Sequence, residues 1–170
     1  MFTSIEIPEA FECPISHQIM VDPVSTVEGD TYDRLGIEEW LKDNLTNPST
    51  GEDLSSNILI TNKVLRSQIK EFVDKNKIAF INELVEALFS KNKEKSKLVL
   101  DLGVTIPWNS NEETYVACIS NARKKFIEGI KNNDADCVQA FLDFGYPVDF
   151  WIKRAGLLCI LLLFMGPTIF

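Results

Sequence analysis

Cysteine and histidine are the side chains in this sequence that could bind a metal ion, or pair as a nucleophile and a base. Cys13 and His17 lie four residues apart, a spacing that would place both on one face of a helix. A structural zinc site takes four such ligands and a two-zinc site takes twice as many, whereas residues 1–75 contain only these two. We therefore expect no metal site and no cofactor. We interpret Cys13 as a buried loop residue and not as a thioester-forming nucleophile.

The remaining cysteines are widely spaced, at positions 118, 137 and 159. No secretory leader pattern precedes Ile5, and nothing in the cysteine spacing demands an oxidising compartment. We expect a cytoplasmic protein with free thiols.

The net charge of −8 is concentrated in one half of the chain. Residues 1–75 hold 6 Lys and Arg against 14 Asp and Glu, whereas residues 76–170 hold 11 of each. An acidic module repels phosphate groups, because clustered Lys and Arg are needed to neutralise them. We therefore expect a basic protein partner and no nucleic acid.

Residues 5–75 are dense in Pro and Gly, which predicts a small, loop-rich domain. Apolar and polar residues alternate over 24–27 and again over 31–32, around Gly29, and this pattern predicts a β-hairpin. Asp33 can then cap a helix of about three turns, whose apolar positions recur at three- and four-residue steps. These positions are Ile37, Trp40, Leu41 and Leu45.

A second helix is predicted from Asn62 to about Val73, after an exposed loop over 47–51. Its apolar stripe comprises Val64, Leu65, Ile69, Phe72 and Val73.

Beyond Lys75 the sequence matches itself without gaps at a spacing of 42 residues. Residues 84–88 align with 126–130, and residues 100–103 align with 142–145. Each copy predicts a helix, a polar connector (90–97 and 132–136), a second helix and a terminating glycine. Such hairpins bury their apolar faces by stacking on one another. Residues 126–149 resemble an ankyrin repeat in this arrangement.

An uncharged run covers residues 155–165. A helix that spans a bilayer needs roughly 20 apolar residues, and shorter runs are typical of buried helices. We favour the opening helix of a further repeat, and a membrane-interface anchor or a short span over 155–170 is the alternative.

An ordered series of residues between Ile7 and Ile69 resembles the U-box, the zinc-free relative of the RING domain found in ubiquitin ligases. The matching positions are Ile7, Pro8, Phe11, Cys13, Pro14, Ile15, Ile19, Met20, Asp22, Pro23, Val24, Gly29, Thr31, Tyr32, Asp33, Arg34, Ile37, Trp40, Leu41, Pro48, Thr50, Leu54, Leu59, Ile60, Asn62, Leu65, Arg66 and Ile69. The resemblance implies an α+β fold, with a RING-like ββα domain and its C-terminal helix over residues 5–75. An all-α, ankyrin-like segment of helical hairpins over 76–170 would follow.

The resemblance also implies a shallow groove that binds a ubiquitin-conjugating enzyme. Carried over by position, Ile15 and His17 lie on its first loop, Trp40 on the central helix and Pro48 on the second loop. A few well-buried apolar anchors suit such a small interface.

A RING-shaped fold without metal must hold its two loops with hydrogen bonds and ion pairs. The candidates are Asp22, Ser25, Glu28, Arg34, Thr50 and Asn62. Any one of them could instead be a solvated loop residue. If Asp22 and Arg34 form a buried pair, replacing either by Ala unfolds the domain, because the surviving charge is left desolvated.

In this family, ubiquitin transfer is expected without a covalent intermediate on the ligase, which holds the charged conjugating enzyme and the substrate lysine close together. Many RING-like domains clamp ubiquitin with a basic or amide side chain just beyond the second loop's proline. The corresponding residue here is Gly51, which leaves open weak catalysis, a substitute donor such as Asn57, or a module that only binds.

We therefore expect a RING-type ubiquitin ligase whose partners are a ubiquitin-conjugating enzyme, ubiquitin and a protein substrate recruited through residues 76–170. The alternative is a non-catalytic interaction protein that binds a conjugating enzyme or another partner without transfer. A bacterial effector acting in the host cytoplasm and an endogenous eukaryotic protein fit the same residues.

Overall fold

Two compact units make up the chain in the computed structural model, which describes residue 2 and residues 4–147. The first unit comprises the residues up to 79 together with 101–104, and the second comprises 80–100 and the residues from 105 onward. The predicted boundary at residue 75 coincides with the end of helix α2 (Lys63–Lys75). The functional division into 5–75 and 76–170 stays a prediction.

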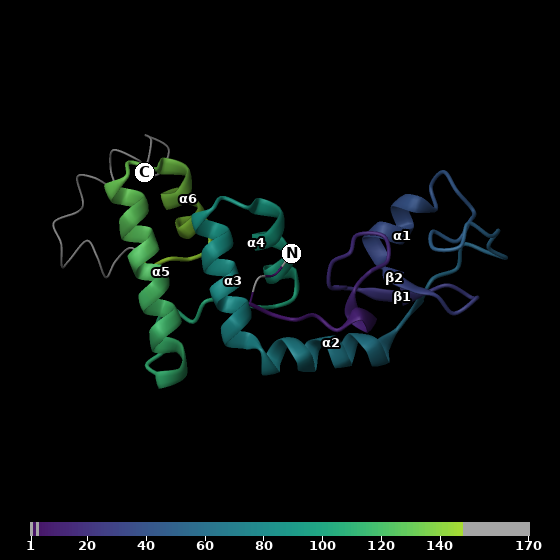
Figure 1. Ribbon diagram of the computed structural model, residues 1–170, viewed down its shortest axis with the longest axis horizontal. Coiled ribbons are helices and arrows are strands. Elements are labelled where there is room, and N and C mark those ends of the chain that lie inside the picture. Colours follow the sequence, from purple (N-terminus) through teal and green to yellow (C-terminus); the bar gives the residue numbers. More distant parts are fainter. Residues whose placement is uncertain (1, 3, 148–170) are drawn as a thin grey trace. The chain divides into compact units, whose positions relative to one another are not determined.

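A three-stranded antiparallel sheet forms the centre of the first unit (Figure 1). Strands β1 (Pro23–Ser25) and β2 (Thr31–Asp33) form the predicted hairpin, with Val24 opposite Tyr32. Gly29 in the turn has a φ of 104°, a value that favours glycine. Strand β3 (Ile60–Thr61) pairs with the other edge of β1. The sequence analysis missed β3 because two residues are too few to show an alternating pattern.

Helix α1 (Arg34–Trp40) follows β2 directly and is shorter than predicted. The expectation of three turns was wrong at its C-terminal end, where the Asn44 side chain donates to the Trp40 carbonyl at 3.1 Å and the chain turns away. Leu45 is 52% exposed. Its carbonyl accepts a bond from the Leu54 backbone at 2.9 Å, so Leu45 belongs to the second loop and not to the apolar face of the helix.

Helix α2 begins as predicted, because the Asn62 side chain accepts a bond from the Leu65 backbone at 3.0 Å and caps the first turn. Val64 is 71% exposed, so its assignment to the apolar stripe was wrong. Ile69 and Val73 are buried. A short 3-10 helix, η1 (Glu9–Phe11), precedes the first strand of the same unit. It contacts α2, because the Phe11 ring meets the Phe72 ring edge-on at 5.5 Å.

The second unit contains two helical hairpins, as the 42-residue repeat predicts. Helices α3 (Lys77–Phe89) and α4 (Lys93–Asp101) form the first, and α5 (Glu113–Lys131) and α6 (Ala135–Asp143) form the second. The connector predicted over 90–97 is only three residues long. It is shorter because Asn92 caps α4 by accepting a bond from the Lys95 backbone at 3.0 Å.

The two hairpins turn with the same hydrogen bonds, 42 residues apart. Backbone bonds close the turns from Asn92 to Ala87 at 2.8 Å and from Asp134 to Gly129 at 2.9 Å. Gly103 and Gly145, which follow α4 and α6, have φ values of 83° and 77° and end these helices in the predicted left-handed conformation. The resemblance of this segment to ankyrin repeats stays a prediction.

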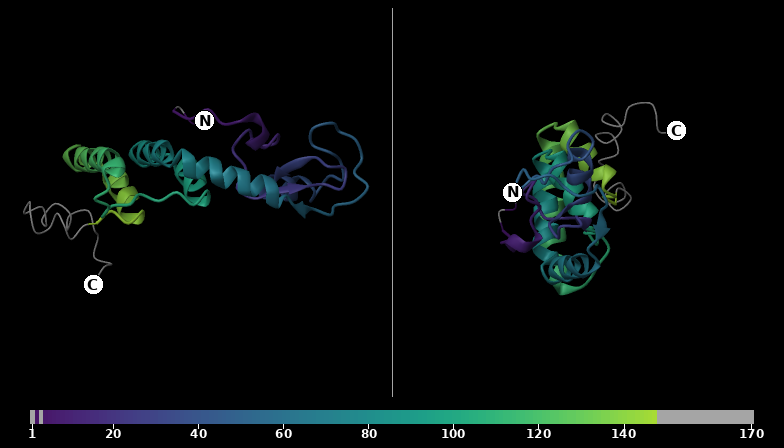
Figure 2. Two further views of the ribbon diagram at one scale, coloured as in Figure 1. Left: turned by 90° about the horizontal axis from the view of Figure 1, so that it is seen from below. Right: turned by 90° about the vertical axis from the view of Figure 1, so that its right-hand side faces the viewer.

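Charged groups join the two hairpins, and α3 and α5 lie side by side in two different views (Figure 1, Figure 2). Lys125 bonds Glu86 at 3.0 Å and lies 4.2 Å from the centre of the Phe89 ring. Lys91 bonds Asp134 at 2.9 Å. This ion pair lowers the pKa of Asp134 below its ordinary value. The hairpins therefore stack through specific pairs as well as through apolar contacts.

Three of the four cysteines, Cys13, Cys118 and Cys137, are free and buried. Cys159 and the uncharged run over 155–165 lie outside the described residues. Within the part of the chain that the structure describes, no helix is both long and apolar enough to cross a membrane.

Close packing between α5 and α6 depends on Gly129. A methyl group built at Gly129 would lie 2.9 Å from the Cys137 sulfur, and Cys137 is fully buried. We predict that Gly129→Ala lowers the free energy of unfolding by about 1–2 kcal/mol, because overpacking outweighs the higher helix propensity of alanine. Calorimetric melting of the chain would measure the effect.

The control is the same substitution in a Cys137→Ala background, where the overlap is removed. There Gly129→Ala should stabilise the chain by up to about 1 kcal/mol through helix propensity alone. The same sign of effect in both backgrounds would contradict the packing explanation.

Candidate functional site

The first loop, residues 12–22, is held in shape by its own backbone. The Cys13 amide donates to the Gln18 carbonyl and the His17 amide donates to the Cys13 carbonyl, both at 2.8 Å. Glu12 and Ile19 form a bridge across the base of the loop. The loop is therefore a tight turn that presents residues 14–18 at its tip.

Ile15 packs from this loop against helix α1. A Cβ atom built on Gly36 would lie 3.6 Å from the Ile15 Cδ1 atom, an ordinary van der Waals distance, so Ile15 lies directly over Gly36. Ile15 is half-buried in this contact. The predicted anchor on the first loop thus lies over the central helix.

Trp40 lies one helical turn beyond Gly36, on the same face of α1. Its indole N–H donates to the Thr46 carbonyl at 2.9 Å, which ties the helix to the second loop, residues 41–59. Pro48 follows two residues later and is half-buried. Ile15, Trp40 and Pro48 are therefore three partly exposed apolar groups carried by α1 and the two loops that meet it.

His17 differs from these three. Its side chain is exposed, and its φ of 53° is uncommon for a residue other than glycine. The structure places it on the first loop, as predicted.

The predicted polar network forms around Asp22 and Arg34. The Arg34 Nε atom donates to the Asp22 carboxylate at 2.7 Å, and an Nη atom donates to the Thr61 hydroxyl at 3.0 Å. Arg66 on α2 bonds the other Asp22 oxygen. The hydrogen bond from Arg34 to Asp22, and then its bond to Glu38, raise the pKa of Arg34 above its ordinary value. One carboxylate thus links the first loop, α1 and α2.

This ion pair is more exposed than expected. The side chains of Arg34 and Asp22 retain 31% and 28% of their exposure, so water compensates either charge when its partner is removed. We therefore replace the expectation that Asp22→Ala or Arg34→Ala unfolds the domain with the expectation of a smaller loss.

Three more of the predicted residues, Ser25, Glu28 and Asn62, form bonds between different segments. The Ser25 hydroxyl meets the Thr31 hydroxyl at 2.8 Å, and the Asn62 amide reaches Ser25 at 3.4 Å. The Glu28 carboxylate accepts bonds from the Ser55 hydroxyl at 2.7 Å and from the Ser55 backbone at 2.8 Å, and these bonds lower the Glu28 pKa. Glu28 thereby connects the hairpin turn to the second loop.

Thr50 does not bridge distant segments in its described bonds. Its exposed hydroxyl contacts the Glu52 side chain at 3.4 Å and the Glu52 backbone at 3.3 Å, two residues away. Its described role is local to the turn.

Asp33 holds the first loop in place, whereas the sequence analysis predicted that it caps α1. It occupies the cap position of α1, but its side chain makes no capping bond there. The carboxylate instead accepts bonds from the backbone of Val21 at 2.7 Å and Asp22 at 2.9 Å. The Asp33 amide donates to the Cys13 sulfur at 3.2 Å. Cys13 is therefore a fully buried acceptor in the brace, which agrees with its predicted structural role.

Asn47 is the most connected residue of the second loop, and the sequence analysis missed its role. Its side-chain oxygen accepts bonds from the Tyr32 hydroxyl and the Ser49 amide at 2.8 Å, and from the Thr50 amide at 3.2 Å. Its side-chain nitrogen donates to Asp30 at 2.6 Å. Asn47 is 4% exposed and its bond with Tyr32 is buried, whereas its bonds with Asp30, Ser49 and Thr50 are partly buried. The Asn-Pro-Ser-Thr sequence signals such a turn, but its burial does not show in the sequence.

Gly51, at the position expected for a clamping side chain, is exposed and has a φ of 77°. Its amide donates to the Asn47 carbonyl at 2.8 Å. The turn thus favours glycine at this position. Glycine also offers no side-chain donor that could hold ubiquitin. Asn57, the proposed substitute, is exposed on the same loop and lines a shallow pocket with Glu38 and Lys42.

Among the described residues, no three His, Cys, Asp or Glu side chains gather where they could hold a metal ion. The chemistry that the described site offers is recognition. Apolar anchors lie on α1 and on loops that hydrogen bonds fix, and Cys13 is enclosed.

We predict that Asn47→Ala lowers the free energy of unfolding of the first unit by about 3 kcal/mol, because it removes the acceptor shared by the buried Tyr32 hydroxyl and two backbone amides of the turn. Arg34→Ala should cost less, since its partner stays accessible to water. Urea denaturation would rank the two variants, with the exposed Asn57→Ala as the control. An Asn47→Ala effect no larger than that of Asn57→Ala would contradict this role for Asn47.

Known protein families and relatives match the same part of the chain. The family model of the U-box domain matches residues 7–78. U-box domain-containing protein 12 of Arabidopsis thaliana is 47% identical over 72 residues, which cover 42% of this chain and 11% of that protein. The E3 ubiquitin-protein ligase SPL11 of Oryza sativa subsp. japonica is 42% identical over 73 residues, which cover 42% of this chain and 10% of the rice protein.

A viral protein matches over a longer stretch. The probable bifunctional E2/E3 enzyme R795 of Acanthamoeba polyphaga mimivirus is 33% identical over 101 residues, or 59% of this chain and 7% of that protein. The chain thus spans about a tenth of the length of these curated relatives, so what it shares with them is a domain. With the loops, the sheet and α1 arranged as above, residues 7–78 form a U-box domain.

Proposed function

We propose that this protein is a ubiquitin ligase of the RING type. The observation that carries the proposal is the placement of Ile15, Trp40 and Pro48 on α1 and the two loops fixed to it, within a U-box domain. Partly exposed apolar side chains on a rigid frame can serve as anchors for a partner, because they lose little conformational freedom on binding. The proposed partner is a ubiquitin-conjugating enzyme that carries ubiquitin as a thioester.

In the proposed mechanism, the ligase forms no covalent intermediate. Cys13, the one cysteine of residues 1–75, is fully buried and accepts a backbone hydrogen bond, which supports a structural role. The rate gain would come from holding the charged conjugating enzyme and a substrate lysine in a productive arrangement. The substrate is proposed to bind the helical segment over 76–170. The cytoplasmic location stays a prediction.

The second candidate function is a binding module that does not promote transfer. Gly51 favours it, because this position offers no side-chain donor to hold ubiquitin against the conjugating enzyme. The two functions share the same docking surface and differ in whether discharge of ubiquitin is accelerated.

We predict that Ile15→Ala weakens binding of a ubiquitin-conjugating enzyme at least about tenfold and abolishes chain formation in a reconstituted ubiquitination reaction. The reason is the loss of an anchor on the docking surface, where truncation of a central residue often costs 2 kcal/mol or more, about 30-fold in affinity. A panel of conjugating enzymes, tested by calorimetry and by gel assay, would measure both effects.

Ile60→Ala is the matched control, since Ile60 is 57% exposed on strand β3 and lies outside α1 and the two loops. Unchanged binding in Ile15→Ala would contradict the docking surface. Binding of the unmodified chain without any ubiquitin transfer across the panel would favour the second candidate function.

A further prediction concerns the missing clamp. Gly51→Arg should accelerate discharge of the charged conjugating enzyme onto free lysine relative to Gly51→Ala, because only the arginine supplies donors. The alanine variant is the required reference, since both substitutions strain a backbone with a φ of 77°. Equal rates for the two variants would show that a donor at this position does not limit transfer.

A further inference from the structure

Apolar side chains run along one face of helix α5, from its first turn to its last. Val116, Ile119, Ile127 and Ile130 lie on this face together with Arg123, because each step between successive members is three or four residues. Val116 is 52% exposed, Ile127 and Ile130 are half-buried, and Ile119 is buried. We call the four apolar residues the outer strip.

The counterpart of this face in α3 is buried. The 42-residue repeat aligns Val85 with Ile127 and Leu88 with Ile130. Val85 and Leu88 are 0% and 1% exposed, and α3 lies beside α5 (Figure 1, Figure 2). In a stack of hairpins, each hairpin covers the outward face of the one before it. The outer strip is therefore the surface on which a third hairpin would pack.

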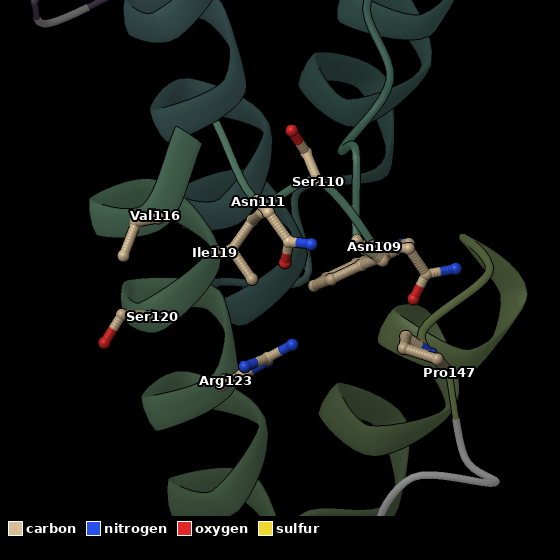
Figure 3. Close-up of a pocket in the computed structure, with 9 residues that line it drawn as sticks. Asn109, Ser110, Asn111, Val116, Ile119, Ser120, Arg123 and Pro147 are labelled. Atoms are coloured by element: carbon tan, nitrogen blue, oxygen red, sulfur yellow. The ribbon is translucent and has the colours of Figure 1, made fainter. Parts of the chain in front are cut away.

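A pocket of about 520 Å³ borders the outer strip, and Val116 and Ile119 line it from α5. Trp108, which lines another side, is 8% exposed and donates its indole N–H to the Phe144 carbonyl at 3.3 Å. Figure 3 shows Ile119 facing the space between α5 and Pro147. Pro147 is the last residue that the structure describes. The chain beyond it therefore starts at the edge of this pocket.

The repeat continues in the sequence beyond this point. Residues 103–108 align with 145–150, and both stretches begin with glycine and end with an aromatic residue. Helix α5 begins at Glu113, and the uncharged run begins 42 residues later, at Ala155. Residues 148–154 connect the pocket edge to the run and can span roughly 20 Å. The run thus holds the position in a third copy that the first part of α5 holds in the second.

We propose that residues 155–165 form a helix that packs against the outer strip of α5, as the opening helix of a third hairpin. The run contains no charged side chain, so its burial leaves no charge without water, and both apolar surfaces gain by leaving water. The aliphatic part of Arg123 can contact apolar groups as well. This inference concerns the second unit and does not depend on the ligase proposal. A membrane and a second copy of the chain are the competing occupants.

A native cysteine in the run provides the first test. Glu86 and Lys125, which form an ion pair between α3 and α5, lie 39 positions apart in the sequence. The same offset from Ser120, which is exposed on α5, leads to Cys159. A disulfide requires the two Cα atoms to lie within about 7 Å of each other. Ser120→Cys in the full chain should therefore form an intramolecular disulfide with Cys159 under mild oxidation.

The control is Thr114→Cys, which is exposed on a different face of α5. Mass spectrometry of unreduced digests should show at least about fivefold more disulfide to Cys159 from position 120 than from position 114, because disulfide geometry is specific. Equal yields at both positions would overturn the proposal, since an unattached segment would reach either one. Disulfides found only between two chains would also overturn it, in favour of a second copy as the occupant.

A charge placed on the outer strip tests the surface itself. In the Ser120→Cys chain, Val116→Asp should lower the disulfide yield at least about fivefold, because covering the strip would take a carboxylate out of water. The neighbouring Ala117→Asp adds the same charge at an exposed position outside the strip and should leave the yield unchanged. Equal yields in the two variants would contradict the assigned role of the strip.

Flotation with phosphatidylcholine vesicles tests the membrane as the occupant. The unmodified full chain should stay in the aqueous fraction, because α5 covers the apolar side of the run. Recovery of the chain with the vesicles would overturn the proposal, since the run would then lie in lipid and not on α5.

Discussion

The buried carboxamide of Asn47 is the interaction on which the arrangement of the proposed docking surface depends. It accepts bonds from the hydroxyl of Tyr32 and from two backbone amides of its own turn, and it donates to Asp30. Tyr32 belongs to the central hairpin, so the second loop is fixed to the sheet at that point. Asp33 does the same for the first loop through two backbone amides. Both loops are therefore fixed to β2, and α1 follows that strand directly.

This bracing differs physically from a metal site. A metal ion would collect several ligands at one point, whereas here neutral amides, hydroxyls and a few carboxylates share the task over many short bonds. Each bond contributes about 1 kcal/mol. A buried multivalent acceptor such as the Asn47 oxygen concentrates three bonds on one atom, so its loss matters more than loss of a partly exposed pair such as Asp22 and Arg34.

Residue spacing was sufficient to predict the hairpin, the start of α2 and the two helical hairpins of the second unit. These features follow from local signals: a glycine at a turn, an asparagine cap and a 42-residue repeat. The roles of Asn47 and Asp33 were not predictable in this way, because they depend on partners that the fold brings close. Leu45 was misassigned because its four-residue step from Leu41 fits a helix, while its carbonyl pairs with Leu54 in the loop.

The acidic residues among the first 75 contribute to the structure, and in the proposed function they also contribute to recognition. Asp22, Glu28, Asp30 and Asp33 each accept hydrogen bonds that join segments of the domain. A hydrogen bond from a neutral group leaves the full negative charge in place, so these carboxylates still contribute to the field at long range. Among these four carboxylates, the described ion pairs involve Asp22, which Arg34 and Arg66 contact. Because diffusional steering depends on net charge, the bracing carboxylates would attract a basic conjugating enzyme without touching it.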